Sequence, residues 1–110
     1  MKAIMRLRCF TSATLLSLLA TLSHAEVVAG KNRAQMACAV CHGQVGLSMQ
    51  PHVPHLAGQP KTYLVEQLRN YRSGKRPHEI MSVIAKTLTD EDIQNLSDWY
   101  ASLTISAEEK

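Results

Sequence analysis

Two cysteines and a histidine lie within five residues of this chain, in the stretch CAVCH of residues 38–42. Thiols spaced in this way can form a disulfide, bind a metal ion such as zinc, work as a thiol redox switch or attach a haem covalently. Each alternative makes different demands on the rest of the sequence. The choice between them therefore depends on the compartment, the secondary structure and the other ligands that the chain offers.

A thiol redox switch and a plain disulfide explain this stretch poorly. Redox motifs of this spacing usually sit at a βαβ element, and no segment of the sequence shows the alternation of a strand. A disulfide between Cys38 and Cys41 would close too small a loop to stabilise the chain much. It would also leave His42 without a role.

Zinc is a sharper alternative, because four candidate ligands follow one another as C-x2-C-x10-H-x2-H. These residues are Cys38, Cys41, His52 and His55. Four nitrogen and sulfur ligands suit a tetrahedral site, but finger-like sites have a longer middle segment and a wider spacing between their histidines. Pro51 and Pro54 keep this histidine pair off a helix, and His42 again stays unused.

Covalent haem attachment uses all three residues of the motif, since C-x-x-C-H is the pattern of a c-type haem site. One helical turn brings Cys38 and Cys41 to the same side, where both thiols can add to the vinyl groups of one porphyrin. The next residue, His42, then lies beneath the iron and can ligate it. The motif therefore predicts one covalent haem c.

The first 25 residues have the pattern of a secretory signal peptide. A basic start precedes the uncharged stretch FTSATLLSLLATL, and Ser23 and Ala25 supply the small residues of a cleavage site. An uncleaved membrane anchor is the alternative, but this stretch is shorter than the roughly 20 residues that span a bilayer. We therefore expect cleavage of residues 1–25, a single domain of residues 26–110 in the periplasm, and no stable membrane insertion afterwards.

Removal of this segment also changes the charge. The sequence has 12 basic and 9 acidic residues, and three of the basic residues lie in the predicted signal peptide. The remaining domain is close to neutral, so nothing indicates a nucleic-acid partner. The remaining cysteines are Cys38 and Cys41, which export would place in an oxidising compartment.

Three segments of the domain have a helical pattern, which predicts an all-α fold. The first covers residues 27–41 and runs into the cysteine motif. The second follows Pro60, which suits a first helical turn, and stops before Gly74. The last and clearest begins after Thr89, with which Asp92 can complete a capping box.

The segments between these helices are predicted to be loops, over residues 44–59 and 75–81, since they hold proline and glycine without a sustained period. The domain keeps only four aromatic side chains, which are Tyr63, Tyr71, Trp99 and Tyr100. A domain this small usually needs a cross-link or bound group for stability. A cofactor at its centre would meet that need.

Residues 29–103 resemble the small bacterial class I cytochromes c, in the branch of cytochrome c4 and cytochrome c553. The similar stretches are AGKNRAQMACAVCHGQVG, PHLAGQPKTYLVEQLRNYRSGKR and MSVIAKTLTDEDIQNLSDWYASL. The resemblance implies a class I cytochrome c fold with three main helices around one haem. It implies a carrier of single electrons and not an enzyme.

The resemblance also implies roles for residues outside the motif. Met81 matches the methionine ligand on the far side of the iron. Pro54 matches a proline whose carbonyl accepts a hydrogen bond from the proximal imidazole. Gly30 and Tyr100 match the positions where the first and last helices cross.

The second iron ligand decides between a carrier and a catalyst, because a histidine and a methionine together leave no open position. We expect Met36 to pack in the core. Met49, His52 and His55 belong to the loop expected to cover the proximal side. Met81 lies in irregular chain and can turn its sulfur inward; His78, beside Pro77, is the main substitute ligand but is expected to be solvated.

Two readings of the function stay open besides the periplasmic electron carrier, whose donor and acceptor the sequence does not reveal. The chain could be the haem subunit of a larger dehydrogenase or oxidase, or an enzyme or gas sensor with an open iron. A basic cluster near the end of the second helix has two readings as well, a docking patch for an acidic redox partner or cations that complement the helix C-terminus. Its members are Arg69, Arg72, Lys75 and Arg76.

Overall fold

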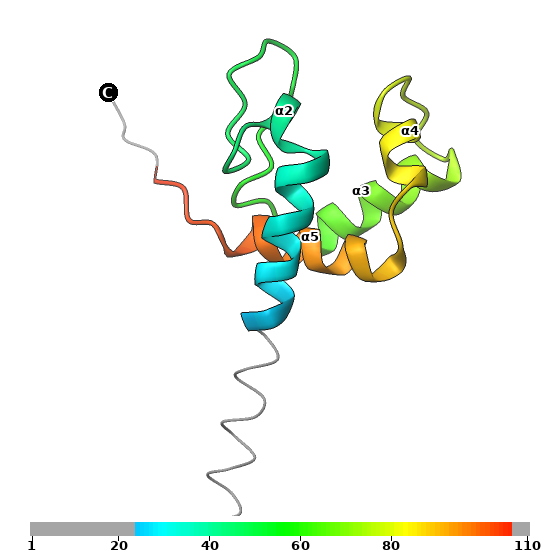
Figure 1. Ribbon diagram of the computed structural model, residues 1–110. Helices are drawn as coiled ribbons and strands as arrows, with labels where there is room; N and C mark the ends of the chain where they lie inside the picture. The colour runs from blue at the N-terminus through cyan, green and yellow to red at the C-terminus, as the bar shows by residue number, and fades with distance from the viewer. Residues whose placement is uncertain (1–23, 107–110) are drawn as a thin grey trace, which may run out of the picture.

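The computed structural model describes residues 24–106, and every regular element in that part of the chain is a helix (Figure 1). The first described helix covers residues 24–37. It is followed by α2 (Ala39–His42), α3 (Lys61–Ser73), α4 (Met81–Lys86) and α5 (Asp90–Ser102). The predicted all-α class is confirmed. The signal-peptide prediction concerns residues 1–25 and lies almost entirely outside the described residues.

The helix of residues 24–37 and α2 form nearly one rod, because only a turn at Cys38 separates them. The predicted helix over residues 27–41 is therefore confirmed, with this one interruption. Gly43 then ends α2 with a φ of 82° and donates its N–H to the Ala39 carbonyl over 3.0 Å. A Cβ at this position would lie 2.1 Å from the Leu47 carbonyl oxygen, so the turn after the cysteine motif requires glycine.

The first helix crosses α5 at close range (Figure 1). A Cβ on Gly30 would lie 1.9 Å from the Asn95 carbonyl oxygen and 3.0 Å from the Trp99 Cβ. Tyr100 is 3% exposed and belongs to the same buried cluster as Ala34. The expected crossing is confirmed, and the absence of a side chain at Gly30 allows it.

Trp99 marks the same crossing from the side of α5. The Lys31 ammonium lies 5.5 Å from the centre of its ring, within the range of a cation–π contact. The Trp99 Nε1 atom is buried without a hydrogen-bond partner. The indole is therefore held by packing and by the Lys31 charge.

The ends of α3 follow the expected signals. Pro60 is the N-cap rather than the first helical residue, with φ −57° and ψ 135°. Gly74 ends the helix in the left-handed region, where its N–H bonds the Tyr71 carbonyl. The helix packs against both α4 and α5, and Lys61 forms an ion pair with Asp98 of α5 at 2.7 Å.

The start of α5 is a complete capping box. The Thr89 hydroxyl accepts the Asp92 N–H over 3.0 Å, and the Asp92 carboxylate accepts the Thr89 N–H over 2.9 Å. Ile93 and Leu96 follow on the inner face and are 0% and 1% exposed. The predicted last helix is confirmed.

Two sequence expectations are wrong. Met81 does not lie in irregular chain but begins α4, a six-residue helix whose N-cap residue, Ile80, offers no side-chain hydrogen bond. Such a helix carries none of the usual start signals. Met36 is not a core residue, because its side chain is 78% exposed. It follows the buried Ala34 by two positions, about 200° around the helix.

The described polypeptide buries few large apolar side chains at its centre. Four of the nine buried apolar residues are alanines. Figure 1 shows α2 and the loop of residues 43–60 on one side and α3 with α4 on the other. These elements surround a cavity.

Candidate functional site

The cavity has a volume of about 290 Å³ and is bordered by α2, the following loop, α3, α4 and α5. Much of its wall is aliphatic and comes from Leu56, Leu64, Leu68, Ile84, Leu88 and Leu96. All five residues that the sequence singles out for a haem also border it, namely Cys38, Cys41, His42, Pro54 and Met81. Residues separated by more than 40 positions therefore meet at one site.

Both cysteines are free thiols on one turn of helix. The Cys38 carbonyl accepts the His42 N–H over 2.9 Å, which closes this turn. Burial raises the pKa of the Cys38 thiol, although a hydrogen bond with Tyr100 opposes the rise. Burial also raises the pKa of the Tyr100 hydroxyl, and its contact with Cys38 adds to the effect. Cys38 thus packs against the core, beside Tyr100.

The imidazole of His42 is 7% exposed and fixed in orientation. Its Nδ1 atom lies 2.9 Å from the carbonyl oxygen of Pro54. A carbonyl can only accept, so Nδ1 donates its N–H here, and in the neutral imidazole Nε2 is then the nitrogen with the free lone pair. An imidazole in this tautomer, bordering the cavity, is suited to ligate a metal through Nε2.

Ser48 holds the loop beneath this histidine, a role that sequence reasoning missed. Its hydroxyl donates to the Cys41 carbonyl over 3.1 Å, and its N–H donates to Nδ1 of His55 over 2.9 Å. Ser48 is 7% exposed. A serine in a proline- and glycine-rich loop gives no sequence signal for such contacts, because they depend on how the loop folds back.

The zinc alternative is wrong. His55 uses Nδ1 to bind the backbone of Ser48. Within residues 24–106, no three His, Cys, Asp or Glu side chains converge in a way that could hold a metal ion. The four residues with zinc-like spacing therefore do not form a tetrahedral site.

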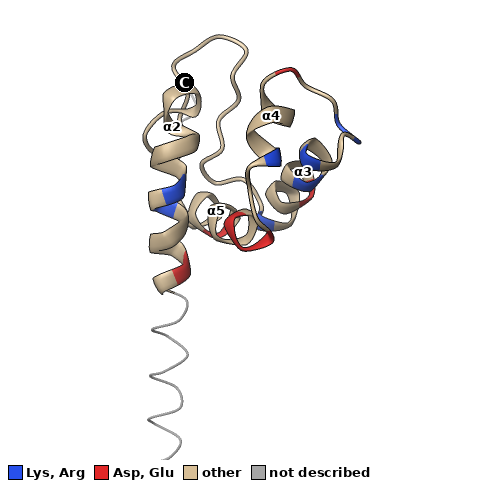
Figure 2. Cartoon of the chain, turned by 45° about the vertical axis from the view of Figure 1, so that its right-hand side comes forward, with Lys and Arg blue, Asp and Glu red and all other residues tan. Residues whose placement is uncertain are grey.

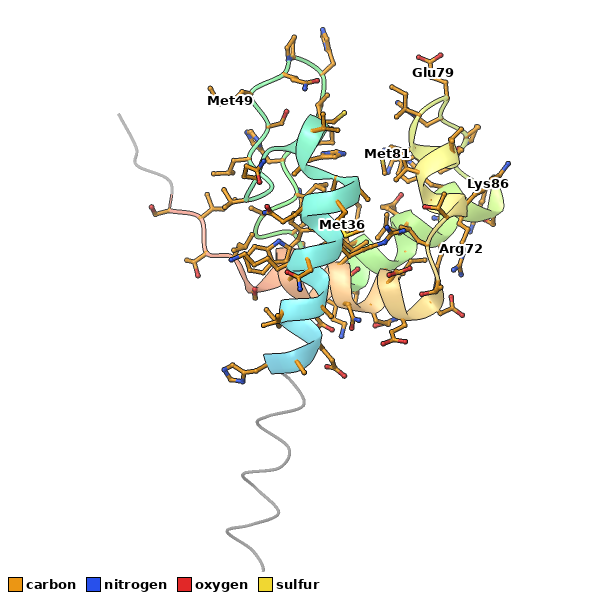
Figure 3. All side chains as sticks on the ribbon, viewed as in Figure 1. Met36, Met49, Arg72, Glu79, Met81 and Lys86 are labelled. Carbon is orange, nitrogen blue, oxygen red and sulfur yellow. The ribbon has the colours of Figure 1, made fainter. Side chains whose placement is uncertain are left out.

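Met81 lies on the side of α4 that faces α2 (Figure 3). It borders the cavity, and the other two described methionines do not. Met36 and Met49 are 78% and 95% exposed, and Figure 3 shows Met49 at the outer edge of the long loop. Of the methionines in the described residues, only Met81 can reach a group bound in the cavity.

His78 is exposed, as expected, but it is not merely solvated. Its ring borders the cavity near Met81. Its Nδ1 atom accepts the backbone N–H groups of Ile80 and Met81, each over 3.2 Å. The imidazole is therefore attached to the helix that carries Met81.

Figure 2 shows basic residues on α3, and part of the basic cluster forms contacts within the fold. Arg72 donates to the Leu88 carbonyl over 3.1 Å and pairs with Asp90 at 2.5 Å. Arg76 lies over the Tyr71 ring, 4.7 Å from its centre, and donates to Gln67. Arg72 and Arg76 are therefore engaged within the fold, through contacts other than the expected one with the carbonyl groups at the end of α3. The side chain of Lys75 makes no such contact.

The residues around the cavity fit a haem held by two thioether bonds. Two thiols stand on one helical turn, the next residue offers an imidazole nitrogen, and a methionine sulfur lies across an apolar space. The low polarity of the wall suits a porphyrin. In the described residues, no helix is long and apolar enough to span a membrane.

Comparison with known proteins gives one family and several relatives. The family Cytochrome c matches residues 27–104. Cytochrome c4 of Pseudomonas aeruginosa is 37% identical over 99 residues, which are 84% of this chain and 49% of that protein. A thiosulfate dehydrogenase electron acceptor of Stutzerimonas stutzeri is 35% identical over 69 residues, or 60% of this chain and 32% of its own length.

A solved structure agrees with these relatives. The crystal structure of reduced recombinant cytochrome c4 from Pseudomonas stutzeri superposes with a TM-score of 0.68 at 28% identity. The match covers 73% of this chain and 49% of that one. The chain thus spans about half the length, or less, of these relatives.

Proposed function

We propose, since this chain belongs to the cytochrome c family, that it transfers single electrons through a haem c bound at the cavity. The observation that carries the proposal is the placement of Cys38, Cys41 and the fixed His42 imidazole on one wall, with Met81 across from them. A bound haem c supplies one-electron redox chemistry at its iron. The polypeptide supplies attachment, ligands and shielding from water.

Each residue of the site has a distinct part in this proposal. Cys38 and Cys41 hold the porphyrin by thioether bonds. His42 would ligate the iron through Nε2, and the Pro54 carbonyl fixes the ring and would raise its basicity. Met81 occupies the opposite side, which favours a high potential and leaves no position for a substrate. The site is therefore that of a carrier, and we propose that the chain is not an enzyme.

The cellular setting is part of the same proposal. Residues 1–25 direct export and are removed, and residues 26–110 work in the periplasm as one domain with one haem. The mass of the purified protein tests this step, since we expect a chain that begins at Glu26 and carries one haem. A mass that retains residues 1–25 would contradict it.

A second candidate is a haem c subunit, or a dedicated acceptor, of a larger dehydrogenase or oxidase. The similarity to a thiosulfate dehydrogenase electron acceptor favours this candidate. In either case the partners are redox proteins, and neither nucleic acid nor stable insertion into a membrane after signal cleavage is involved. Purification from the native host separates the two, because a free carrier elutes alone and a subunit elutes with a stoichiometric partner.

The main test is production of the chain together with a working haem-ligation system. We expect a red protein whose haem stays attached after denaturation and whose spectrum titrates with one electron. A Cys38→Ala, Cys41→Ala variant should lose the covalent haem. A protein that is colourless and yet stably helical under these conditions would contradict the proposal.

A further inference from the structure

His78 makes a closed set of contacts with the first turn of α4. Its Nδ1 atom accepts the N–H groups of Ile80 and Met81, each over 3.2 Å. The backbone N–H of His78 donates to the Ser82 hydroxyl over 3.0 Å, and the backbone carbonyl of His78 accepts the Ser82 N–H over 3.0 Å. Residues 78–82 are thereby joined into one compact unit.

These contacts replace a missing helix cap. The first N–H groups of a helix have no partner within it, and the N-cap residue of α4, Ile80, has no side-chain acceptor. Asparagine, aspartate, serine or threonine usually meets this need. Here an imidazole that precedes the helix supplies the acceptor.

The ring of His78 is also fixed from the other side. It meets the Tyr71 ring edge-on, with 6.1 Å between the ring centres and 80° between the planes. Tyr71 belongs to α3 and is itself covered by Arg76. His78 thus connects the start of α4 to α3, against which α4 packs.

We propose that His78 is a positioning residue, which holds the backbone of Met81 so that the methionine sulfur stays at the cavity opposite His42. The proposal rests on the proposed function, since it assumes Met81 as iron ligand. Met81 is the first residue of a helix of only six. Without an acceptor at Nδ1 the first turn can fray, and the sulfur then dissociates more readily.

The test compares variants that move one acceptor atom. The side chain of His78→Asn places an acceptor oxygen near the position of Nδ1. The longer side chain of His78→Gln places the acceptor near the position of Nε2 instead, and His78→Ala has no side-chain acceptor. Glu79→Gln is the matched control, because Glu79 is the exposed neighbour in the same loop. The readouts for each purified oxidised haem protein are the far-red methionine–iron absorption band, the redox potential and the affinity for added imidazole, which competes with Met81.

We expect His78→Ala and His78→Gln to bind imidazole about tenfold more tightly than the wild type, which corresponds to the loss of about one helix cap. Their far-red band should weaken and their potential should fall. His78→Asn and Glu79→Gln should stay within about twofold of the wild type. If the His78→Ala protein does not fold, the His78→Gln protein provides the same test, because it keeps a long polar side chain.

Two results would overturn the positioning role. One is a His78→Ala or His78→Gln protein with wild-type imidazole affinity; the other is a His78→Asn protein as impaired as His78→Gln. Failure of the underlying ligand assignment looks different. In that case the wild type lacks the far-red band, or Met81→Ala keeps it.

Discussion

At the scale of single residues, the proposed function depends most on Met81, the methionine that borders the cavity. The wall that faces Met81 carries His42, whose orientation is fixed by Pro54. If both residues ligate the iron, the bond between them also closes a long loop of the chain. Met81 would then have a part in stability as well as in redox chemistry.

We expect Met81→Ala to lower the redox potential, to open the iron to carbon monoxide and to lower the free energy of unfolding. The loop between the ligands is about 40 residues long, so the loss is on the order of 4 kcal/mol at most. It will be smaller in practice because the iron–sulfur bond is reversible. Potentiometry, carbon monoxide binding and denaturant unfolding measure these effects.

Met36→Ala is the matched control, since the same side chain is removed from an exposed position. It should leave the potential and the carbon monoxide response unchanged. A Met81→Ala protein that keeps the wild-type potential and still rejects carbon monoxide would show that Met81 is not a ligand.

The part of the site that could be predicted from the sequence consists of residues that are close together along the chain. Cys38, Cys41 and His42 follow from spacing on one helical turn. Pro54 follows only from the resemblance to a family, because no local rule relates it to the motif, whereas Met81 follows from that resemblance and from the comparison of the candidate ligands. Ser48 and the capping role of His78 could not be predicted, since both depend on how loops fold back onto the backbone.

At the scale of elements, helices with capping signals were predicted well and the helix without them was missed. α3 ends at a left-handed glycine and α5 starts with a capping box, and both ends were expected from those residues. α4 takes its cap from His78. A histidine is not a recognised capping residue, so the sequence predicts no helix here and places Met81 at the end of a loop.

The capping box at Thr89 gives a prediction for α5. We expect Thr89→Ala to lower the free energy of unfolding by about 1 kcal/mol, because the Asp92 N–H loses its acceptor. Thr104→Ala, beyond the end of the helix and exposed, should change it by less than about 0.5 kcal/mol. Denaturant titration of the haem protein measures both, and equal values would contradict the capping role.

The Arg72–Asp90 pair joins α3 to the start of α5 and predicts a pH effect. The hydrogen bond from Arg72, and its charge, hold the pKa of the Asp90 carboxyl below its usual value. Because this pKa is lower in the folded state, ionised Asp90 stabilises the fold at any pH above its unfolded pKa of roughly 3.9. This stabilisation is lost as the pH falls through the pKa of the folded state.

Asp90→Asn should therefore lose less stability than the wild type between about pH 5 and pH 2. The effect will be small, because the carboxyl is exposed and screened by solvent. Glu91→Gln, in the same helical turn, is the control and should follow the wild type. Thermal unfolding across this pH range provides the measurement; parallel curves for wild type and Asp90→Asn would exclude a role for the pair.

At the scale of the whole molecule, the described polypeptide is built around a space. Of its nine buried apolar side chains, four are alanines, and larger ones such as Leu64, Leu88 and Leu96 border the cavity. A domain this small is marginal when it buries so little apolar surface. The haem is thus expected to complete the core.

We expect the Cys38→Ala, Cys41→Ala chain, made without covalent haem, to be largely unfolded at 25 °C. Its circular dichroism should show much less helix than the wild type, and denaturant should give no cooperative transition. The haem-loaded wild type is the control. A double variant with wild-type helix content and a sharp transition would show that the polypeptide alone suffices.

The crossing of the first helix with α5 also provides a probe. The sequence contains one tryptophan, and Trp99 sits at this crossing beneath the Lys31 ammonium. A porphyrin absorbs light at the wavelengths that an indole emits, so the native protein should be nearly dark in fluorescence. Emission should appear when α5 separates from the bound porphyrin, which would allow this separation to be followed in time.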